Sequence, residues 1–131
     1  VTGAAHPENP TEMEALVEAL GAEAVSWSHK TECCGAGHAL VRPDLVVDLV
    51  GRILADAQAA GAEALAVACP LCQHNLDIRQ EEAARAAELS AMPVFFFTQL
   101  VALAFGLEAQ AALDRLLVDP RPLLRMHGLH G

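Results

Sequence analysis

Short apolar runs that alternate with helical patterns constrain the fold of this chain most. Residues 63–68 (EALAVA) form an apolar run without polar alternation, which is typical of a strand buried on both faces of a parallel sheet. Residues 92–97 (MPVFFF) have the same character, and 24–28 (AVSWS) are expected to form a third, shorter strand. Because helices alternate with these strands, the sequence predicts an α/β fold: a three-layer, open, mainly parallel sheet with helices on both faces, Rossmann-like in type.

Helix signals separate the predicted strands. Thr11 and Glu14 have the spacing of a capping box, Pro43 suits a first helical turn, and Thr98 is expected to cap a later helix. Helices are expected over about 11–20, 43–60, 70–89, 99–105 and 108–117. The tail from Asp119 onward is expected to be irregular, because Pro120 and Pro122 interrupt it.

Composition limits the kind of protein this can be. With 131 residues, 53% of them hydrophobic, the chain suits one domain over residues 1–131. A formal charge of −9 argues against nucleic acid or an anionic membrane surface as partner. The sequence has no run of 18 uncharged apolar residues and no secretory pattern. Four clustered cysteines then predict a reducing, cytoplasmic location, with metal or redox use favoured over a disulfide framework.

The four cysteines occur as two pairs. Cys33 and Cys34 lie in ECCGAGH, and Cys69 and Cys72 lie in CPLC, which opens a predicted helix. Both pairs follow predicted strands, and the carboxyl ends of parallel strands meet at one edge of the sheet, where such folds bind ligands. The four thiols are therefore expected to converge on one site.

The residues alone leave several uses of these thiols open. Cysteines can simply be small core residues, although two pairs at strand ends do not fit that interpretation well. A CxxC dithiol of thioredoxin type explains the second pair and leaves the first unexplained. A zinc site of four thiolates uses all four, but adjacent ligands are strained around one small ion. An iron–sulfur cluster has several iron corners, so neighbouring cysteines can bind different irons.

Three motifs carry a resemblance to a known family. TECCG at 31–35, CPLCQHNLD at 69–77 and PVFFFTQL at 93–100 resemble the cysteine-rich CCG domain found in the B subunit of heterodisulfide reductase. Related domains occur in iron–sulfur subunits of glycolate oxidase and of some succinate dehydrogenases, and the similarity extends over nearly the whole chain.

The resemblance implies an oxidoreductase subunit with a noncubane [4Fe-4S] cluster. Cys33, Cys34, Cys69 and Cys72 would be the cluster ligands. Such a subunit cleaves a disulfide in one-electron steps or passes electrons to iron–sulfur or flavin partner subunits, through which it could also be associated with a membrane. The alternatives are a zinc-binding structural or docking domain and a CxxC dithiol oxidoreductase.

Polar and glycine residues near the cysteines receive expectations of the same kind. Gly35 and Gly37 would allow the backbone to approach the inorganic core closely. His29, Lys30 and His38 are candidates to offset thiolate charge or deliver protons, and solvated loop positions are an equal alternative for each. His74, two residues after Cys72, is expected to face solvent.

One departure from the family pattern affects the cofactor. The family has a further cysteine upstream of the CC pair, whereas no cysteine precedes Cys33 here, and the chain begins with Val1. The chain is therefore expected to be the C-terminal part of a longer subunit, with the cluster in the full-length protein. By itself it is expected to be inactive and to carry zinc, a disulfide or no group. An exposed sheet edge would also permit homodimers.

Overall fold

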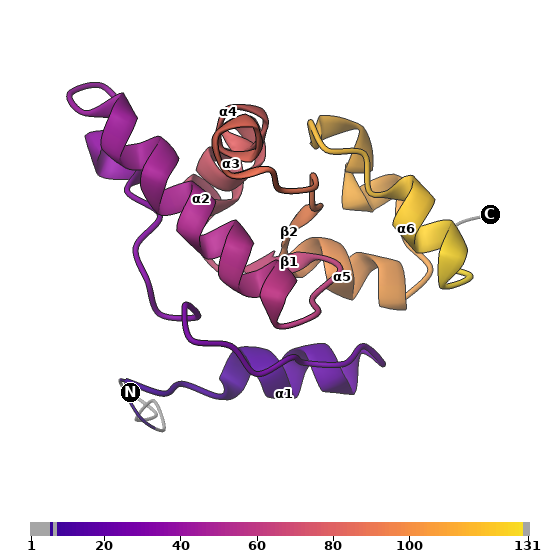
Figure 1. Ribbon diagram of the computed structural model, residues 1–131. Coiled ribbons are helices and arrows are strands. Elements are labelled where there is room, and N and C mark those ends of the chain that lie inside the picture. Colours follow the sequence, from indigo (N-terminus) through magenta and orange to yellow (C-terminus); the bar gives the residue numbers. More distant parts are fainter. Residues whose placement is uncertain (1–5, 7, 130–131) are drawn as a thin grey trace.

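Two parallel strands lie at the centre of the fold (Figure 1). The computed structural model describes residue 6 and residues 8–129. The elements in chain order are α1 (Glu12–Ala19), the 3₁₀ turn η1 (Ala36–His38), α2 (Pro43–Ala59), β1 (Leu65–Val67), α3 (Pro70–Ile78), α4 (Gln80–Ala87), β2 (Val94–Phe96), α5 (Phe97–Ala104), the 3₁₀ turns η2 (Glu108–Ala111) and η3 (Leu113–Arg115), and α6 (Arg121–Met126).

The sheet confirms two of the predicted strands and their parallel pairing. Strand β1 pairs with β2 in the register Leu65–Val94 to Val67–Phe96, and α3 and α4 form the connection between them. Both strands are shorter than the apolar runs that predicted them. Mixed α/β structure is thus present, while a larger Rossmann-like sheet in three layers stays a prediction.

Apolar side chains cover both faces of the strand pair. Neighbouring residues of a strand point to opposite faces. Val94 belongs to the larger apolar cluster, which includes the inner face of α2, and Phe95 belongs to a second cluster with residues of η2, η3 and α6. Figure 1 shows α2 and α4 on one side of the strands and α5 on the other.

The prediction of a strand at 24–28 is wrong. These residues have no strand conformation, and the chain runs from α1 to η1 as an irregular connection (Figure 1). A strand exists only through hydrogen bonds to a neighbouring strand. Here the backbone N–H of Ser28 donates to the Asp56 carboxylate at 3.0 Å instead.

The helix 43–60 is confirmed, whereas the cap predicted for α1 is wrong. Helix α2 begins at Pro43 and buries one face, and Gly61, at φ +85°, follows its end. At α1 neither half of the expected capping box forms: the side chain of Thr11 makes no capping hydrogen bond, and the Glu14 carboxylate accepts from Lys30 Nζ at 2.5 Å.

The segment predicted as one helix over 70–89 is two helices. Helix α3 ends at Ile78 and α4 begins at Gln80. The buried Gln80 donates from Nε2 to the Met92 carbonyl at 2.6 Å and accepts from the Met92 N–H at 2.8 Å. These two bonds attach α4 to the segment that enters β2.

The last third of the chain differs most from expectation. Thr98 does not cap α5, because the helix already begins at Phe97 and its N-cap residue is Phe96. Gln99 Oε1 accepts from the Phe96 N–H at 2.9 Å. The predicted helix 108–117 is the two 3₁₀ turns η2 and η3, separated by Ala112 at φ +50°. The tail expected to be irregular contains α6. In the described part of the chain no helix is long and apolar enough to cross a bilayer.

Candidate thiol site

The structure brings one cysteine of each motif into contact. Cys34 Sγ donates to Cys72 Sγ at 3.3 Å, although the two residues are 38 positions apart in the sequence. Cys34 is 2% exposed and belongs to the larger apolar cluster, against which Cys72 packs. The connection before η1 and the first turn of α3 therefore meet at a pair of sulfur atoms.

The neighbouring Cys33 has different surroundings from Cys34. Cys33 is exposed, and its Sγ accepts a weak hydrogen bond from the Gly35 N–H at 3.4 Å. Two consecutive residues thus present one thiol to solvent and one to the interior.

The two cysteines of CPLC differ in the pKa of their thiols. Cys69 is exposed at the start of α3, where the amides of Cys72 and Leu71 lower the pKa of its thiol. Burial, together with the neighbouring Cys34 and Cys69 sulfurs, raises the pKa of Cys72 to about 12. The helix start therefore favours the thiolate at Cys69 and not at Cys72.

Gly35 shapes the turn that carries Cys34. It is buried with φ +76°, and a Cβ there would lie 2.8 Å from Leu49 Cδ1 on α2. Only glycine combines this left-handed conformation with the close packing. A Cβ at Gly37 would meet no protein atom within 4 Å. Among protein contacts, the need for glycine is thus at position 35.

Asn75 connects the two cysteine motifs and was not identified from the sequence. It is 4% exposed, and its Nδ2 donates to the Cys34 carbonyl at 2.9 Å. Its Oδ1 accepts from Arg79 Nε at 3.2 Å. Asn75 follows Cys72 by three residues, so both lie on the same face of α3. This spacing of three residues is the sequence feature that could have indicated a role for Asn75 beside Cys72.

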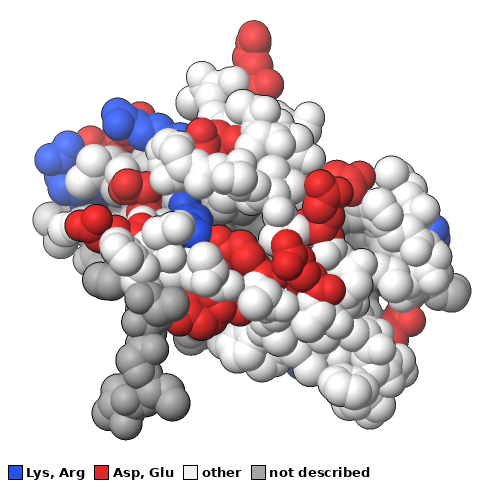
Figure 2. Space-filling view, turned by 90° about the horizontal axis from the view of Figure 1, so that it is seen from below, with Lys and Arg blue, Asp and Glu red and all other residues white. Residues whose placement is uncertain are grey.

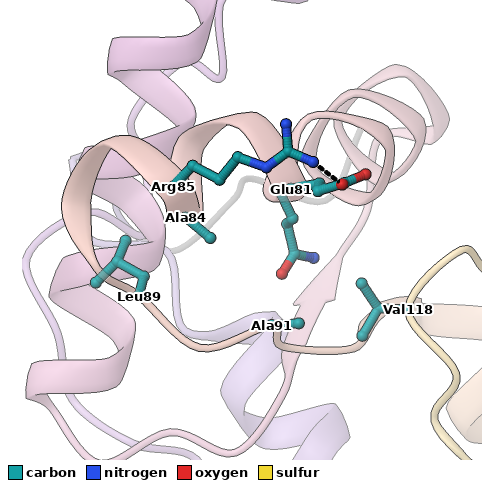
Figure 3. A pocket seen from close by; sticks show the side chains of 7 residues that line it. Glu81, Ala84, Arg85, Leu89, Ala91 and Val118 are labelled. Carbon is teal, nitrogen blue, oxygen red and sulfur yellow. Dashed lines mark hydrogen bonds and ion pairs between the residues drawn. The ribbon is translucent and has the colours of Figure 1, made fainter.

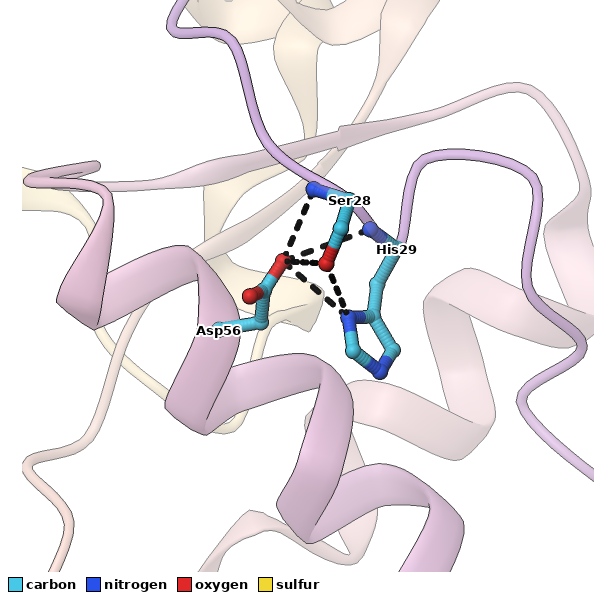
Figure 4. A network of polar contacts seen from close by, with 3 residues as sticks. All are labelled: Ser28, His29 and Asp56. Atoms are coloured by element: carbon cyan, nitrogen blue, oxygen red, sulfur yellow. Dashed lines mark hydrogen bonds and ion pairs between the residues drawn. The ribbon is translucent and has the colours of Figure 1, made fainter.

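A polar network holds the chain upstream of the CC pair (Figure 4). Asp56 Oδ2 on α2 accepts from the Ser28 N–H and Oγ, each at 3.0 Å, and lies 3.0 Å from His29 Nδ1. Hydrogen bonding to His29, followed in effect by the Ser28 bonds, lowers the pKa of Asp56. The network anchors residues 28 and 29 to α2.

The other polar candidates lie in ordinary surroundings. Lys30 Nζ donates to Glu14 Oε1 at 2.5 Å and to the Pro10 carbonyl at 2.8 Å. His38 and His74 are exposed. His29 and Lys30 therefore each have a carboxylate partner, and a role for either toward the thiols stays a prediction.

The four thiols suit a soft metal, but in this structure they are not gathered around one point. Thiolates favour iron–sulfur clusters and zinc over magnesium or calcium. Across residues 6 and 8–129, no three His, Cys, Asp or Glu side chains are grouped closely enough to hold one ion. The close contact is between Cys34 and Cys72, with Cys69 beside it and Cys33 facing outward.

The surface has two further features, a pocket and a band of acidic side chains. A pocket of about 400 Å³ is lined mainly by α4 residues, with Ala91 and Val118 on its far side, and contains no cysteine (Figure 3). Acidic side chains extend along the middle of the face shown in Figure 2. The chain has 17 acidic and 8 basic residues, which gives the net charge of −9.

Comparison with known proteins identifies the family. The model of the cysteine-rich CCG domain matches residues 1–77, which include Cys33, Cys34, Cys69 and Cys72. The chain belongs to the CCG family. The predicted resemblance is confirmed, and the relatives place this CCG domain with those of the B subunits of heterodisulfide reductases.

Two of the relatives are named as subunits of redox enzymes, and a third is named for its likeness to such a subunit. The chain is 36% identical over 103 residues to the 8-methylmenaquinol:fumarate reductase membrane anchor subunit of Wolinella succinogenes, covering 78% of this chain and 36% of that protein. It is 31% identical over 102 residues to the B subunit of the ferredoxin/F(420)H(2)-dependent CoB-CoM heterodisulfide reductase of Methanosarcina acetivorans, covering 76% and 34%. A protein of Archaeoglobus profundus, named for its likeness to the B subunit of heterodisulfide reductase, is 30% identical over 107 residues, covering 79% and 36%. The chain spans about a third of the length of these relatives.

Proposed function

We propose that this CCG domain is a redox module of the type found in the B subunit of heterodisulfide reductase. In the longer protein, Cys33, Cys34, Cys69 and Cys72 would hold an iron–sulfur cluster of the noncubane [4Fe-4S] kind. Such a cluster supplies one-electron transfer, either to a partner subunit or for the reduction of a disulfide. The observation that carries the proposal is the contact of Cys34 with Cys72, which joins the CC and CPLC motifs at one place.

The surroundings of the thiols support a cluster over a single ion. Cys33 is exposed and Cys34 is buried, so the adjacent sulfurs have different environments. A cluster with several iron corners accepts such ligands, whereas a tetrahedral zinc site requires four sulfurs at about 2.3 Å from one point. The protein itself contributes a buried backing behind Cys34 and amides that favour the thiolate at Cys69.

A specific observation favours a second candidate, a dithiol oxidoreductase. In CPLC the first cysteine is exposed with a lowered pKa, and the second is half-buried with a raised pKa. Cys69 would then attack a small disulfide, and Cys72 would displace the resulting mixed disulfide, forming the Cys69–Cys72 bond and releasing two thiols. Cys33 would have no part in this reaction.

Iron analysis with single cysteine variants separates the candidates. In the full-length subunit, purified without oxygen, we expect iron, sulfide and visible absorption to fall together in Cys33→Ser, Cys34→Ser, Cys69→Ser and Cys72→Ser. Disulfide reductase activity that survives Cys33→Ser with no loss of rate would overturn the cluster proposal and support the dithiol. For the 131-residue chain alone we propose zinc, a disulfide or no group in place of the cluster, and about four irons per chain would contradict this.

Partners and location complete the proposal. Two relatives are named as subunits, one of them a membrane anchor subunit, so we propose that this domain also works within a complex of iron–sulfur or flavin subunits. A cytoplasmic location, with membrane association through partners, fits that arrangement. Purification of the native complex from its source would test it, and recovery of the subunit without any partner would count against it.

A further inference from the structure

We propose that Asn75 is a positioning residue that holds Cys34 beside Cys72 and so decides which thiols pair on oxidation. Its amide fixes the Cys34 backbone against α3, and mild oxidation then joins Cys34 to Cys72 rather than Cys69 to Cys72. The inference concerns the thiols of the proposed function but does not depend on a cluster, because it applies to the metal-free chain.

Both ends of the Asn75 side chain have partners. Nδ2 donates to the Cys34 carbonyl at 2.9 Å, and Oδ1 accepts from Arg79 Nε at 3.2 Å. The residue is 4% exposed, so water does not readily replace a lost bond. Arg79 orients the amide, and the amide holds the residue that carries the buried thiol.

The sulfur atoms are already near bonding distance. Cys34 Sγ and Cys72 Sγ are 3.3 Å apart, and a disulfide bond of about 2.05 Å requires them to approach by little more than 1 Å. With oxidised glutathione as oxidant, one thiol forms a mixed disulfide and releases one glutathione. The second thiol then displaces the other glutathione. One S–S bond is formed and one is broken, and the two thiol protons end on the two reduced glutathione molecules.

Tryptic peptides distinguish the two pairings. Cleavage after Lys30, Arg52 and Arg79 gives one peptide with Cys33 and Cys34 (31–52) and one with Cys69 and Cys72 (53–79), since Arg42 precedes a proline. A link between the two peptides reports a bond from the CC motif to the CPLC motif, which includes the Cys34–Cys72 pairing that Asn75 favours, and a loop within 53–79 reports the CPLC disulfide. The ratio of the two products, after equilibration of the metal-free chain in glutathione buffer and acid quenching, is the measurement.

The adjacent cysteines provide an internal control for that ratio. We expect the link between peptides to dominate in the unsubstituted chain, to disappear in Cys34→Ser and to persist in Cys33→Ser. A dominant loop within 53–79, or loss of the link in Cys33→Ser alone, would overturn the proposal.

A matched pair of amide variants tests Asn75 itself. Asn75→Asp removes the donor to the Cys34 carbonyl, and Gln80→Glu removes the equally buried donor to the Met92 carbonyl, away from the thiols. Both changes are expected to lower the free energy of unfolding. Only Asn75→Asp should lower the ratio of the link between peptides to the loop within 53–79. The expected decrease is about tenfold if the lost hydrogen bond contributes about 1.5 kcal/mol, the upper end of the usual range. If the buried carboxylate unfolds the chain, Asn75→Ala is measured in its place.

The outcomes separate this inference from the proposed function. A ratio unchanged in the Asn75 variant, or lowered equally by Gln80→Glu, would refute a positioning role. Because the assay contains no iron, a failure of cluster binding leaves its result intact. Equally, a failure of Asn75 to set the ratio leaves the iron analysis of the cysteine variants unaffected.

Discussion

Replacing Gly35 by alanine tests the packing that places Cys34. Two costs are expected. An L-residue in the left-handed region at φ +76° costs about 1–2 kcal/mol, and the new Cβ, 2.8 Å from Leu49 Cδ1, adds an overlap. Because that atom is the end of a side chain, we place the overlap near the lower limit for overpacking, about 1 kcal/mol. Gly35→Ala should therefore lower the free energy of unfolding by about 2–3 kcal/mol.

Two other glycines separate the cost of the left-handed backbone from the cost of the overlap with Leu49. Gly21 has φ +90° with no atom within 4 Å of a Cβ, so Gly21→Ala measures the backbone cost alone, about 1–2 kcal/mol. Gly37 also has open space and is not in the left-handed region, so Gly37→Ala should change stability by no more than about 0.5 kcal/mol. Leu49→Ala removes the overlapping methyl group. In that background, Gly35→Ala should cost only the backbone part.

Urea unfolding followed by circular dichroism measures all of these variants. The double-mutant cycle between positions 35 and 49 gives the overlap directly as a coupling energy. If Gly35→Ala costs no more than Gly21→Ala, or if Leu49→Ala does not reduce its cost, the overlap is not what requires glycine at position 35. If Gly21→Ala costs nothing, the left-handed backbone carries no penalty and cannot explain a cost at Gly35.

Two predictions concern titrating groups. Hydrogen bonding to His29 lowers the pKa of Asp56 below 3.8, so the carboxylate stabilises the folded chain above about pH 3.8 and this contribution is lost as the pH falls through the folded pKa. The melting temperature of the unsubstituted chain should therefore exceed that of Asp56→Asn by less at about pH 3 than at about pH 6. Asp48→Asn, at an exposed position, is the control. The prediction is contradicted if the difference for Asp56→Asn does not change with pH, or if the difference for Asp48→Asn shrinks equally. In the metal-free chain, iodoacetamide near pH 8 should alkylate Cys69 well before Cys72, because the pKa is lowered at Cys69 and raised to about 12 at Cys72. Peptide mapping over time measures the alkylation rate of each cysteine. Equal rates at Cys69 and Cys72 in the folded chain would refute the predicted difference in thiol pKa.

Local patterns were sufficient where a segment's structure depends mainly on its own residues. Helix α2 has a helical apolar face and Pro43 in its first turn, and it forms where predicted. Pro70 opens α3 directly after an apolar run, and β1 and β2 lie within the two runs that had no polar alternation. These features depend on the spacing of residues along the chain, which the sequence shows directly.

Patterns failed where a side chain had a choice of partners. Glu14 could cap α1 or bind Lys30, and it binds Lys30. Residues 24–28 have the composition of a strand, but a strand needs a partner strand, and Ser28 instead binds Asp56 on α2. Such competition is decided by which groups meet in three dimensions.

The sequence by itself determined the family, the four thiols and their grouping as CC and CPLC. Only the tertiary structure decided how those thiols differ: Cys34 lies in the apolar cluster against Cys72, while Cys33 and Cys69 face solvent. The reason is physical. Burial and proton affinity depend on atoms brought together from positions 38 residues apart, and the amide of Asn75 that joins the two motifs acts on a backbone carbonyl that no sequence pattern reveals.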